Sequence, residues 1–112
     1  MLKKGFRLTK KEDFDRVFRS GKPLFFEEIA CRYAPNNLSY LRLGFSISKK
    51  HFPLAVERNR LRRLITAAIE AENFLPSGVD IVFFSIKKQK SANYRQFQGL
   101  IEKAFKCINK QR

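Results

Sequence analysis

The strongest constraint on the fold is a nearly continuous apolar run over residues 79–86. Such a run is typical of a central strand that is covered on both faces. A helical pattern over 55–73 precedes it, and before that comes a strict apolar–polar alternation over 41–48. A strand, a helix and a buried strand in this order predict a parallel β–α–β unit within an otherwise antiparallel sheet.

The rest of the chain supplies the remaining elements. Thr9 and Glu12 fit a capping box for a short helix that ends before Pro23. Residues 24–34 indicate two extended segments with a break near Glu27, and the second segment alternates as a half-buried strand does. We expect Asn93 and Gln96 to cap a last helix. Its apolar stripe consists of Phe97, Ile101, Ala104, Phe105 and Ile108. The order α-β-β-β-α-β-α in 112 residues predicts one domain over 1–112, with 1–8 as a basic arm.

Charge narrows the choice of partner. Lys and Arg number 24 and Asp and Glu number 10, so the net charge is +14. A small domain this basic repels itself unless a polyanion offsets the charge, so nucleic acid is the leading partner. An anionic membrane surface is the rival, but the sequence lacks the exposed apolar face that this role requires. No apolar run reaches spanning length and no signal peptide is evident, so we expect a cytoplasmic protein. Cys31 and Cys107 are expected to be buried, reduced thiols.

The helix over 55–73 carries its charges in the order that its dipole disfavours. Arginines crowd its first half, while Glu70 and Glu72 lie near its end. A helix built only for stability would reverse this order, whereas an external polyanion explains it. The polar residues of this half are Arg58, Asn59, Arg60, Arg62 and Arg63. Arginine in place of lysine also favours phosphate forks and stacking on exposed bases.

Two further features indicate contact with a nucleic-acid backbone. The polar face of the segment 41–48 carries only small or basic side chains, and Lys49 and Lys50 follow it. The polar residues of that face are Arg42, Gly44, Ser46 and Ser48. Phe14 and Phe18 stand one helical turn apart among basic neighbours. Spacing alone favours a core role for these two rings, and a groove in which bases stack is the alternative.

Catalysis by the chain's own side chains is not indicated. His51 is the single histidine and lies in a basic loop, without the signature of a serine or cysteine nucleophile. No glycine-rich phosphate loop and no carboxylate cluster for a metal are recognisable. These absences argue against a metal-dependent nuclease that acts alone.

Taken together, these residues resemble the protein subunit of bacterial ribonuclease P. The resemblance rests on 44–50, Gly-Phe-Ser-Ile-Ser-Lys-Lys, followed by 55–63, Ala-Val-Glu-Arg-Asn-Arg-Leu-Arg-Arg. Residues 12–18 match the family's first helix, and 80–88 match its last strand and the basic turn after it. Arg62 stands where lysine is common, and 51–54 replace a loop that often contains Gly-Asn.

The resemblance implies a compact αβββαβα two-layer sandwich of the α+β class, with a mixed sheet. It implies an unusual left-handed β–α–β crossover, as in ribosomal-protein-like and elongation-factor-G-like RNA-binding domains. It also implies an endoribonuclease holoenzyme in which the RNA subunit and its Mg²⁺ ions catalyse the reaction. The protein would bind that RNA and the 5′ leader of precursor tRNA. We expect no membrane, no protein partner, and no metal or cofactor held by the protein alone.

By carry-over, Phe14 and Phe18 would line the leader cleft, with Arg42, Ser46 and Ser48 on its floor. Either Arg32 or Tyr33 takes the position of a cleft aromatic. The remaining RNA-binding candidates are Lys49, Lys50, Arg58, Asn59, Arg60, Arg62, Arg63, Lys87 and Lys88. The alternative function is a ribosomal or RNA-chaperone protein that binds RNA without a role in cleavage.

Overall fold

The computed structural model describes residues 7–26, 29–72, 76–86 and 94–110. Its elements are α1 (Lys11–Ser20), β1 (Lys22–Phe26), β2 (Ile29–Pro35), β3 (Arg42–Ser46), α2 (Ala55–Glu70), β4 (Val79–Ser85) and α3 (Tyr94–Lys110). The number, type and order of these elements agree with the succession expected from the sequence. Lys87 and Lys88, most of the expected basic arm, and Asn93 lie outside the described residues, and so do the side chains of Gln96 and Phe97.

The four strands form one mixed sheet in the order β1-β2-β4-β3. β1 and β2 form an antiparallel hairpin, and β2 is also antiparallel to β4. β3 is parallel to β4 and is joined to it through α2, so the predicted β–α–β unit is confirmed. β4 lies between two strands, as its apolar run predicted. The handedness of the crossover stays a prediction.

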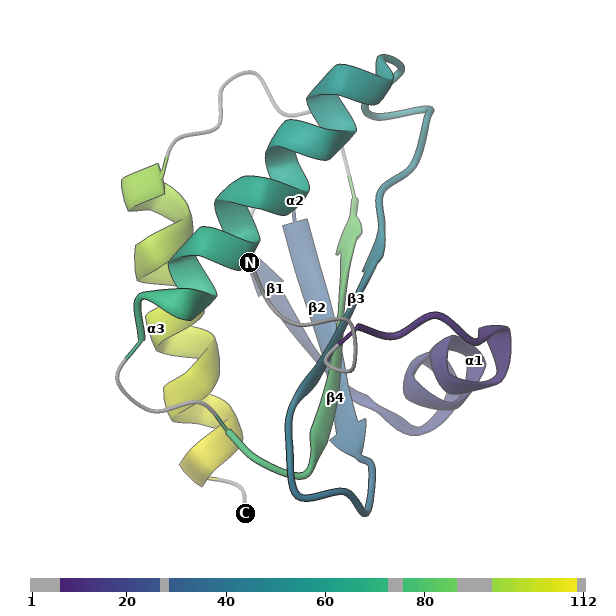
Figure 1. The fold of residues 1–112 in the computed structure, drawn as a ribbon, viewed down its shortest axis with the longest axis vertical. Coiled ribbons are helices and arrows are strands. Elements are labelled where there is room, and N and C mark those ends of the chain that lie inside the picture. The colour runs from purple at the N-terminus through teal and green to yellow at the C-terminus, as the bar shows by residue number, and fades with distance from the viewer. Residues whose placement is uncertain (1–6, 27–28, 73–75, 87–93, 111–112) are drawn as a thin grey trace.

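One face of the sheet carries the main core. α2 and α3 cover this face side by side (Figure 1). α2 contributes Leu61, Ile65, Ala68 and Ile69, and α3 contributes Ile101, Phe105 and Ile108, all buried. The expected apolar stripe of the last helix is therefore confirmed wherever its side chains are described. Every second residue of β4 points into this core, including Ile81 and Phe83.

The opposite face carries α1 and a smaller apolar cluster (Figure 1). Leu8, Val17, Ala34 and Val82 are its buried members, and Phe14 packs against them. β2 is consequently buried on both faces, and the expectation of a half-buried strand was wrong. The alternation over 29–34 did not reveal this because alanines fill the α1 side, where a helix packs closely.

Two local expectations are corrected. The N-cap of α1 is Lys10 rather than Thr9, and no side chain caps the helix. The Lys10 carbonyl accepts the first N–H groups of the helix, from Asp13 at 3.1 Å and Phe14 at 3.3 Å. Cys31 is buried as expected, but Cys107 is exposed because it lies on the outer side of α3.

Candidate nucleic-acid interface

An aromatic groove lies between α1 and the sheet. Phe14 rests on Gly44 of β3 so closely that a Cβ at residue 44 would lie 2.8 Å from the ring. One turn later, the Phe18 ring meets the edge of Phe84 of β4, with centroids 5.4 Å apart and planes at 61°. Phe18 remains 36% exposed. Glycine at residue 44 thus allows one ring to lie against the sheet, while the next ring stays accessible to a ligand.

The strand register continues this groove across the sheet. Ser46 of β3 pairs with Phe84 of β4, and Phe84 pairs with Ala30 of β2. Ala30 in turn pairs with Phe25 of β1, whose side chain is 64% exposed. Paired residues point to the same face, so this row lies on the α1 side. The exposed residue Ser46 therefore lies on the same face as Phe84 and Phe25.

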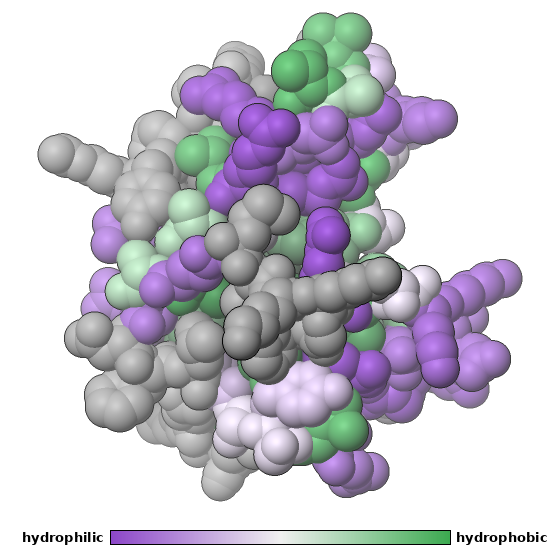
Figure 2. All heavy atoms as spheres, viewed as in Figure 1, coloured by the Kyte–Doolittle hydropathy of each residue, from purple (hydrophilic) through white to green (hydrophobic). Residues whose placement is uncertain are grey.

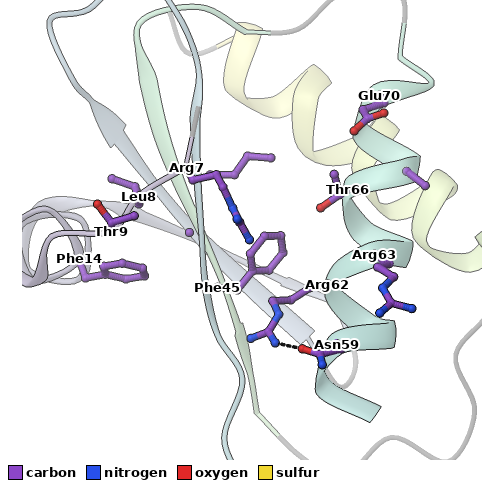
Figure 3. Close-up of a pocket in the computed structure, with 13 residues that line it drawn as sticks. Arg7, Leu8, Thr9, Phe14, Phe45, Asn59, Arg62, Arg63, Thr66 and Glu70 are labelled. Atoms are coloured by element: carbon purple, nitrogen blue, oxygen red, sulfur yellow. Dashed lines mark hydrogen bonds between the residues drawn. The ribbon is translucent and has the colours of Figure 1, made fainter. Parts of the chain in front are cut away.

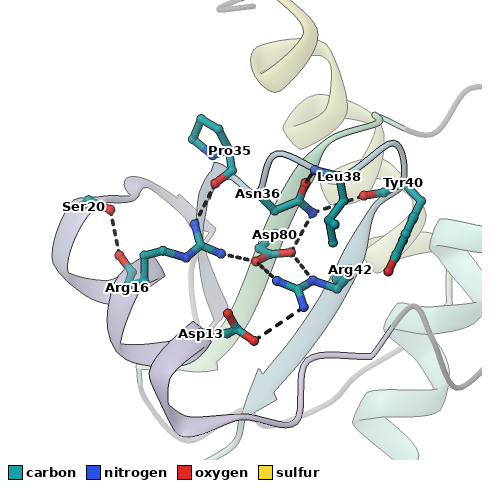
Figure 4. A network of polar contacts seen from close by, with 9 residues as sticks. All are labelled: Asp13, Arg16, Ser20, Pro35, Asn36, Leu38, Tyr40, Arg42 and Asp80. Atoms are coloured by element: carbon teal, nitrogen blue, oxygen red, sulfur yellow. Dashed lines mark hydrogen bonds and ion pairs between the residues drawn. The ribbon is translucent and has the colours of Figure 1, made fainter.

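A buried carboxylate ties α1 to the sheet (Figure 4). Asp80 is fully buried, and its two oxygens accept four hydrogen bonds. Arg42 donates two of these, at 2.8 Å from Nε and 2.7 Å from Nη2. Asn36 Nδ2 donates another at 2.8 Å, and Arg16 on α1 donates the fourth from Nη2. A buried charge is tolerated only when it is fully paired in this way.

Arg42 is therefore held within the protein rather than presented to a ligand. Its hydrogen bond with Asp80, together with the charges of Asp80 and Asp13, raises the pKa of its guanidinium against the effect of burial. Its third nitrogen lies 3.5 Å from Asp13 on α1. Through Asp80 and Asp13 the Arg42 side chain ties α1 to the sheet, and its role as an RNA contact stays a prediction.

Arg32 also supports α1. It lies on the α1 face of β2, where its Nη1 donates to the carbonyls of Phe18 and Gly21 at 3.3 Å each. Tyr33 faces the main core and is buried. Of the two candidates for the cleft aromatic, the structure thus places Arg32 on the groove side.

The loop after β3 presents two lysines. Ser48 Oγ accepts the backbone N–H of Lys50 at 3.1 Å, and the Ser48 N–H donates to Ser85 Oγ at 2.9 Å. His51 Nδ1 lies 3.0 Å from the same Ser85 oxygen. Lys49 and Lys50 are exposed on this turn. The Ser48 hydroxyl therefore shapes the loop that carries Lys49 and Lys50.

A cleft of about 720 Å³ opens at the outer edge of β3, between α2 and the segment before α1 (Figure 3). Arg62, Arg63 and Asn59 of α2 line it on one side. Arg7 lines it on the other, together with Phe14 and Gly44 of the aromatic groove. Phe45 lies between these groups and stacks on Phe83, with centroids 5.8 Å apart. Arg62 Nη2 donates to Asn59 Oδ1. Three arginines from two distant segments line this cleft beside a single acidic residue, Glu70, which suits the binding of phosphate groups.

The other two arginines of the motif lie outside the cleft lining. Arg58 Nη1 donates to the carbonyls of Phe52 and Pro53, at 2.8 and 3.0 Å, so it holds the preceding loop. Arg60 is exposed. The motif is therefore divided among three roles: lining a cleft, shaping a loop and presenting charge on the surface.

Sequence reasoning missed four contributors. Arg7 and Phe45 line the cleft, Phe84 lies beneath Phe18, and Asp80 anchors α1. Asp80 gave a usable signal, because a single carboxylate within a buried apolar strand requires cationic partners. Phe45 lies within the 44–50 motif but on its apolar face, and Arg7 and Phe84 have no distinctive neighbours, so only the packing of distant elements identifies these three.

The described residues contain no group of three or more His, Cys, Asp or Glu side chains that could hold a metal ion. Within the same residues, no helix is both long enough and apolar enough to cross a bilayer.

Comparisons with known proteins agree with this geometry. The sequence model of the family described as Ribonuclease P matches residues 2–109. The ribonuclease P protein component of Legionella pneumophila strain Lens is 42% identical over 84 residues, covering 75% of this chain and 72% of that protein. The corresponding protein of Caldanaerobacter subterraneus subsp. tengcongensis is 36% identical over 107 residues, covering 95% of this chain and 91% of its own.

Solved structures show the same fold. The ribonuclease P protein of Thermotoga maritima superposes with a TM-score of 0.77 at 28% identity, covering 89% of this chain and 94% of that one. A Staphylococcus aureus ribonuclease P protein, a mutant with defective mRNA degradation activity, superposes with a TM-score of 0.81 at 26% identity. That match covers 95% of this chain and 90% of the other.

Proposed function

Because this chain belongs to the ribonuclease P protein family, and is thus the protein component of an endoribonuclease holoenzyme, we propose how it divides its contacts between two RNAs. The groove between α1 and the sheet binds the 5′ leader of precursor tRNA. The cleft at the outer edge of β3, with the basic loop, binds the catalytic RNA. The observation that carries the proposal is that the two surfaces meet at one edge strand: Phe14 and Gly44 of the groove also line the cleft that carries Arg62 and Arg63.

The groove suits a single-stranded leader. Phe14 and Phe18 offer aromatic surface, and base stacking on aromatic rings tolerates any sequence. The small side chains of Gly44 and Ser46 allow a sugar–phosphate backbone to approach β3 closely. A leader varies in sequence among tRNA precursors, so stacking and close approach are more useful there than base-specific hydrogen bonds.

The cleft and loop suit a structured RNA. Arg7, Arg62 and Arg63 line the cleft, and Lys49 and Lys50 extend the positive charge beyond it. Arginine forks bind phosphate oxygens in pairs and so favour a fixed backbone geometry. A ribosomal or RNA-chaperone role would use similar charge, but the family match favours the ribonuclease P subunit.

We place the chemistry on the RNA subunit and its Mg²⁺ ions rather than on this chain. His51 faces the Ser85 hydroxyl, and Asp80 is enclosed by its cationic partners, so both are committed to structure. The protein contributes positive charge that lowers the repulsion between two RNA backbones, and it positions the leader relative to the cleavage site.

Reconstitution tests the holoenzyme role. The purified chain, a bacterial ribonuclease P RNA and 5′-labelled precursor tRNA are mixed at low Mg²⁺, with each component alone as a control. Cleavage at the mature 5′ end that requires both the protein and the RNA is the expected result. Binding without cleavage would favour the RNA-chaperone function, and cleavage by the protein alone would contradict the placement of the chemistry.

Leader length tests the groove. Phe14→Ala should weaken binding of a precursor with a leader by about fivefold or more, because stacking on one ring contributes on the order of 1–3 kcal/mol. Leaderless tRNA should bind the variant as it binds the original chain. Equal losses for both RNAs, in a variant that remains folded by circular dichroism, would contradict the leader assignment.

A further inference from the structure

The start of α2 presents four consecutive exposed apolar residues, which we call the apolar tip: Pro53, Leu54, Ala55 and Val56. The side chains of Leu54 and Val56 are 59% and 70% exposed. Figure 2 shows this hydrophobic group at the end of the molecule where α2 begins, with hydrophilic atoms around it. Single apolar side chains on a surface are common, but a run of four is not expected without a function.

Stability does not explain these residues. Leu54 is the N-cap of α2 and makes no side-chain hydrogen bond there, although serine, threonine, aspartate or asparagine would be preferred at that position. Val56 is β-branched and contacts solvent, which gives the helix no packing advantage. Both positions therefore hold residues that an isolated helix would disfavour.

The tip is nevertheless held rigidly. Phe52, directly before it, is buried in the main core. Arg58 donates to the carbonyls of Phe52 and Pro53, and the N–H of Phe52 donates to the Ser48 carbonyl at 2.9 Å. A surface fixed before binding loses little conformational entropy when a partner arrives.

The charge around the tip identifies the partner. Residues 49–63 carry six basic side chains and one acidic side chain, and the tip lies in the middle of this segment. A polyanion with exposed apolar surface would complement both features, and an RNA with unstacked bases has that chemistry. Resting on the proposed function, we infer that the apolar tip packs against an unpaired base or an exposed sugar face of the catalytic RNA, while the surrounding cations bind its phosphates.

The salt dependence of binding distinguishes this contact from a phosphate contact. Each phosphate contact adds about 0.7–0.9 to the magnitude of the slope of log K against log salt, whereas an apolar contact leaves that magnitude unchanged. The test compares the double variant Leu54→Ser/Val56→Ser with the original chain for binding to ribonuclease P RNA over a series of salt concentrations. Serine is a preferred N-cap, and its helix propensity is close to that of valine, so the helix is preserved.

The double variant should lose about tenfold in affinity, a fraction of what full burial of a leucine and a valine provides, with no change in slope. Leu38→Ser is the matched control, since Leu38 is also exposed but lies in the turn before β3, at the other end of the molecule. It should bind as the original chain does.

Three results would overturn the inference. These are unchanged affinity of the double variant, a loss accompanied by a lower slope, or a loss of binding to anionic lipid vesicles while RNA affinity is unchanged. The last result would make the tip a membrane contact. Failure of the original chain to support cleavage in the reconstitution would instead contradict the proposed function, so the two failures are distinguishable.

Discussion

The two faces of the sheet are stabilised in different ways. The face beneath α2 and α3 is packed with branched aliphatic and aromatic side chains, and Ile65, Ile81 and Ile108 have no solvent exposure. The α1 face has a small apolar cluster, and its helix is also held by an ion network centred on Asp80. Apolar packing has no preferred direction, so the main core does not by itself set the orientation of a helix. Hydrogen bonds are directional, so the Asp80 network fixes α1 in one orientation.

This difference corresponds to the two RNA contacts that we propose. The aromatic groove requires Phe14 and Phe18 to stand at a fixed place above β3, and the Asp80 network supplies that placement from one side of α1. The cleft at the outer edge of β3 takes its arginines from α2, which the main core already fixes. Changes on the α1 face should therefore affect leader binding, while changes in the main core should affect stability alone.

The largest effect is expected from Asp80→Ala. It leaves Arg42 and Arg16 without their buried partner, and breaking a buried pair costs about 3–5 kcal/mol of unfolding free energy. Urea denaturation measures this loss. Leader-dependent affinity, measured under conditions where the variant is folded, should fall as well, because α1 is no longer oriented.

Ile65→Ala is the matched change on the other face. It should cost about 2–5 kcal/mol by leaving a cavity in the main core. Leader affinity per folded molecule should stay unchanged in this variant. If the two variants lost leader affinity equally, the distinction between the faces would be wrong.

Gly44→Ala should have the next largest effect. The new methyl group would lie 2.8 Å from the Phe14 ring and 3.0 Å from the Leu8 Cβ, so the ring must move away from β3. Overpacking of this kind costs about 1–3 kcal/mol. The expected signature is a larger loss of affinity for precursors with a leader than for catalytic RNA, both measured by fluorescence anisotropy. Normal leader binding by the variant would show that the Phe14–Gly44 contact is not part of the site.

The two faces of the sheet also differ in how well the sequence predicts them. Periodicity predicted the main core, because burial of a stripe such as Leu61, Ile65 and Ile69 depends on spacing alone. It did not predict that Arg42 and Arg32 would act within the protein. Whether an arginine meets RNA or a carboxylate depends on which distant residue lies opposite, here Asp80 for Arg42. That information is absent from local patterns.

Phe14 and Phe18 illustrate the intermediate case. Their spacing alone favoured a core role, and the family resemblance favoured a groove. The structure gives each ring a different degree of both: Phe14 packs on Gly44 and the small cluster, while Phe18 keeps about a third of its surface exposed, at 36%. A choice between core and groove, made from the sequence, could not describe two rings that are each partly buried to a different extent.

A smaller effect is expected from Arg63→Ala at the cleft. Arg63 lines the cleft and belongs to a helix fixed by the main core, so the fold should be unaffected. Loss of one phosphate contact should lower the slope of log K against log salt by about 0.7–0.9 for binding to catalytic RNA. An unchanged slope would contradict a phosphate role for this residue. Leader discrimination should be as in the original chain, in contrast to Gly44→Ala.

The smallest effect is expected from alkylation of the two native cysteines. Their reactivity measures how well the main core is closed and requires no substitution in it. Burial raises the pKa of Cys31 to about 12, so it remains a protonated thiol enclosed beneath α2 and α3 at neutral pH. Cys107 is exposed. Because the thiolate is the reacting species, an alkylating reagent at pH 8 should modify Cys107 alone in the folded chain and both cysteines in denaturant. Mass spectrometry measures the difference.

Asp80→Ala, which disturbs the α1 face, should leave Cys31 protected wherever the variant is folded. Ile65→Ala should speed the modification of Cys31, because it loosens the main core. Equal protection of Cys31 in both variants would show that the two faces of the sheet open together and are not independent.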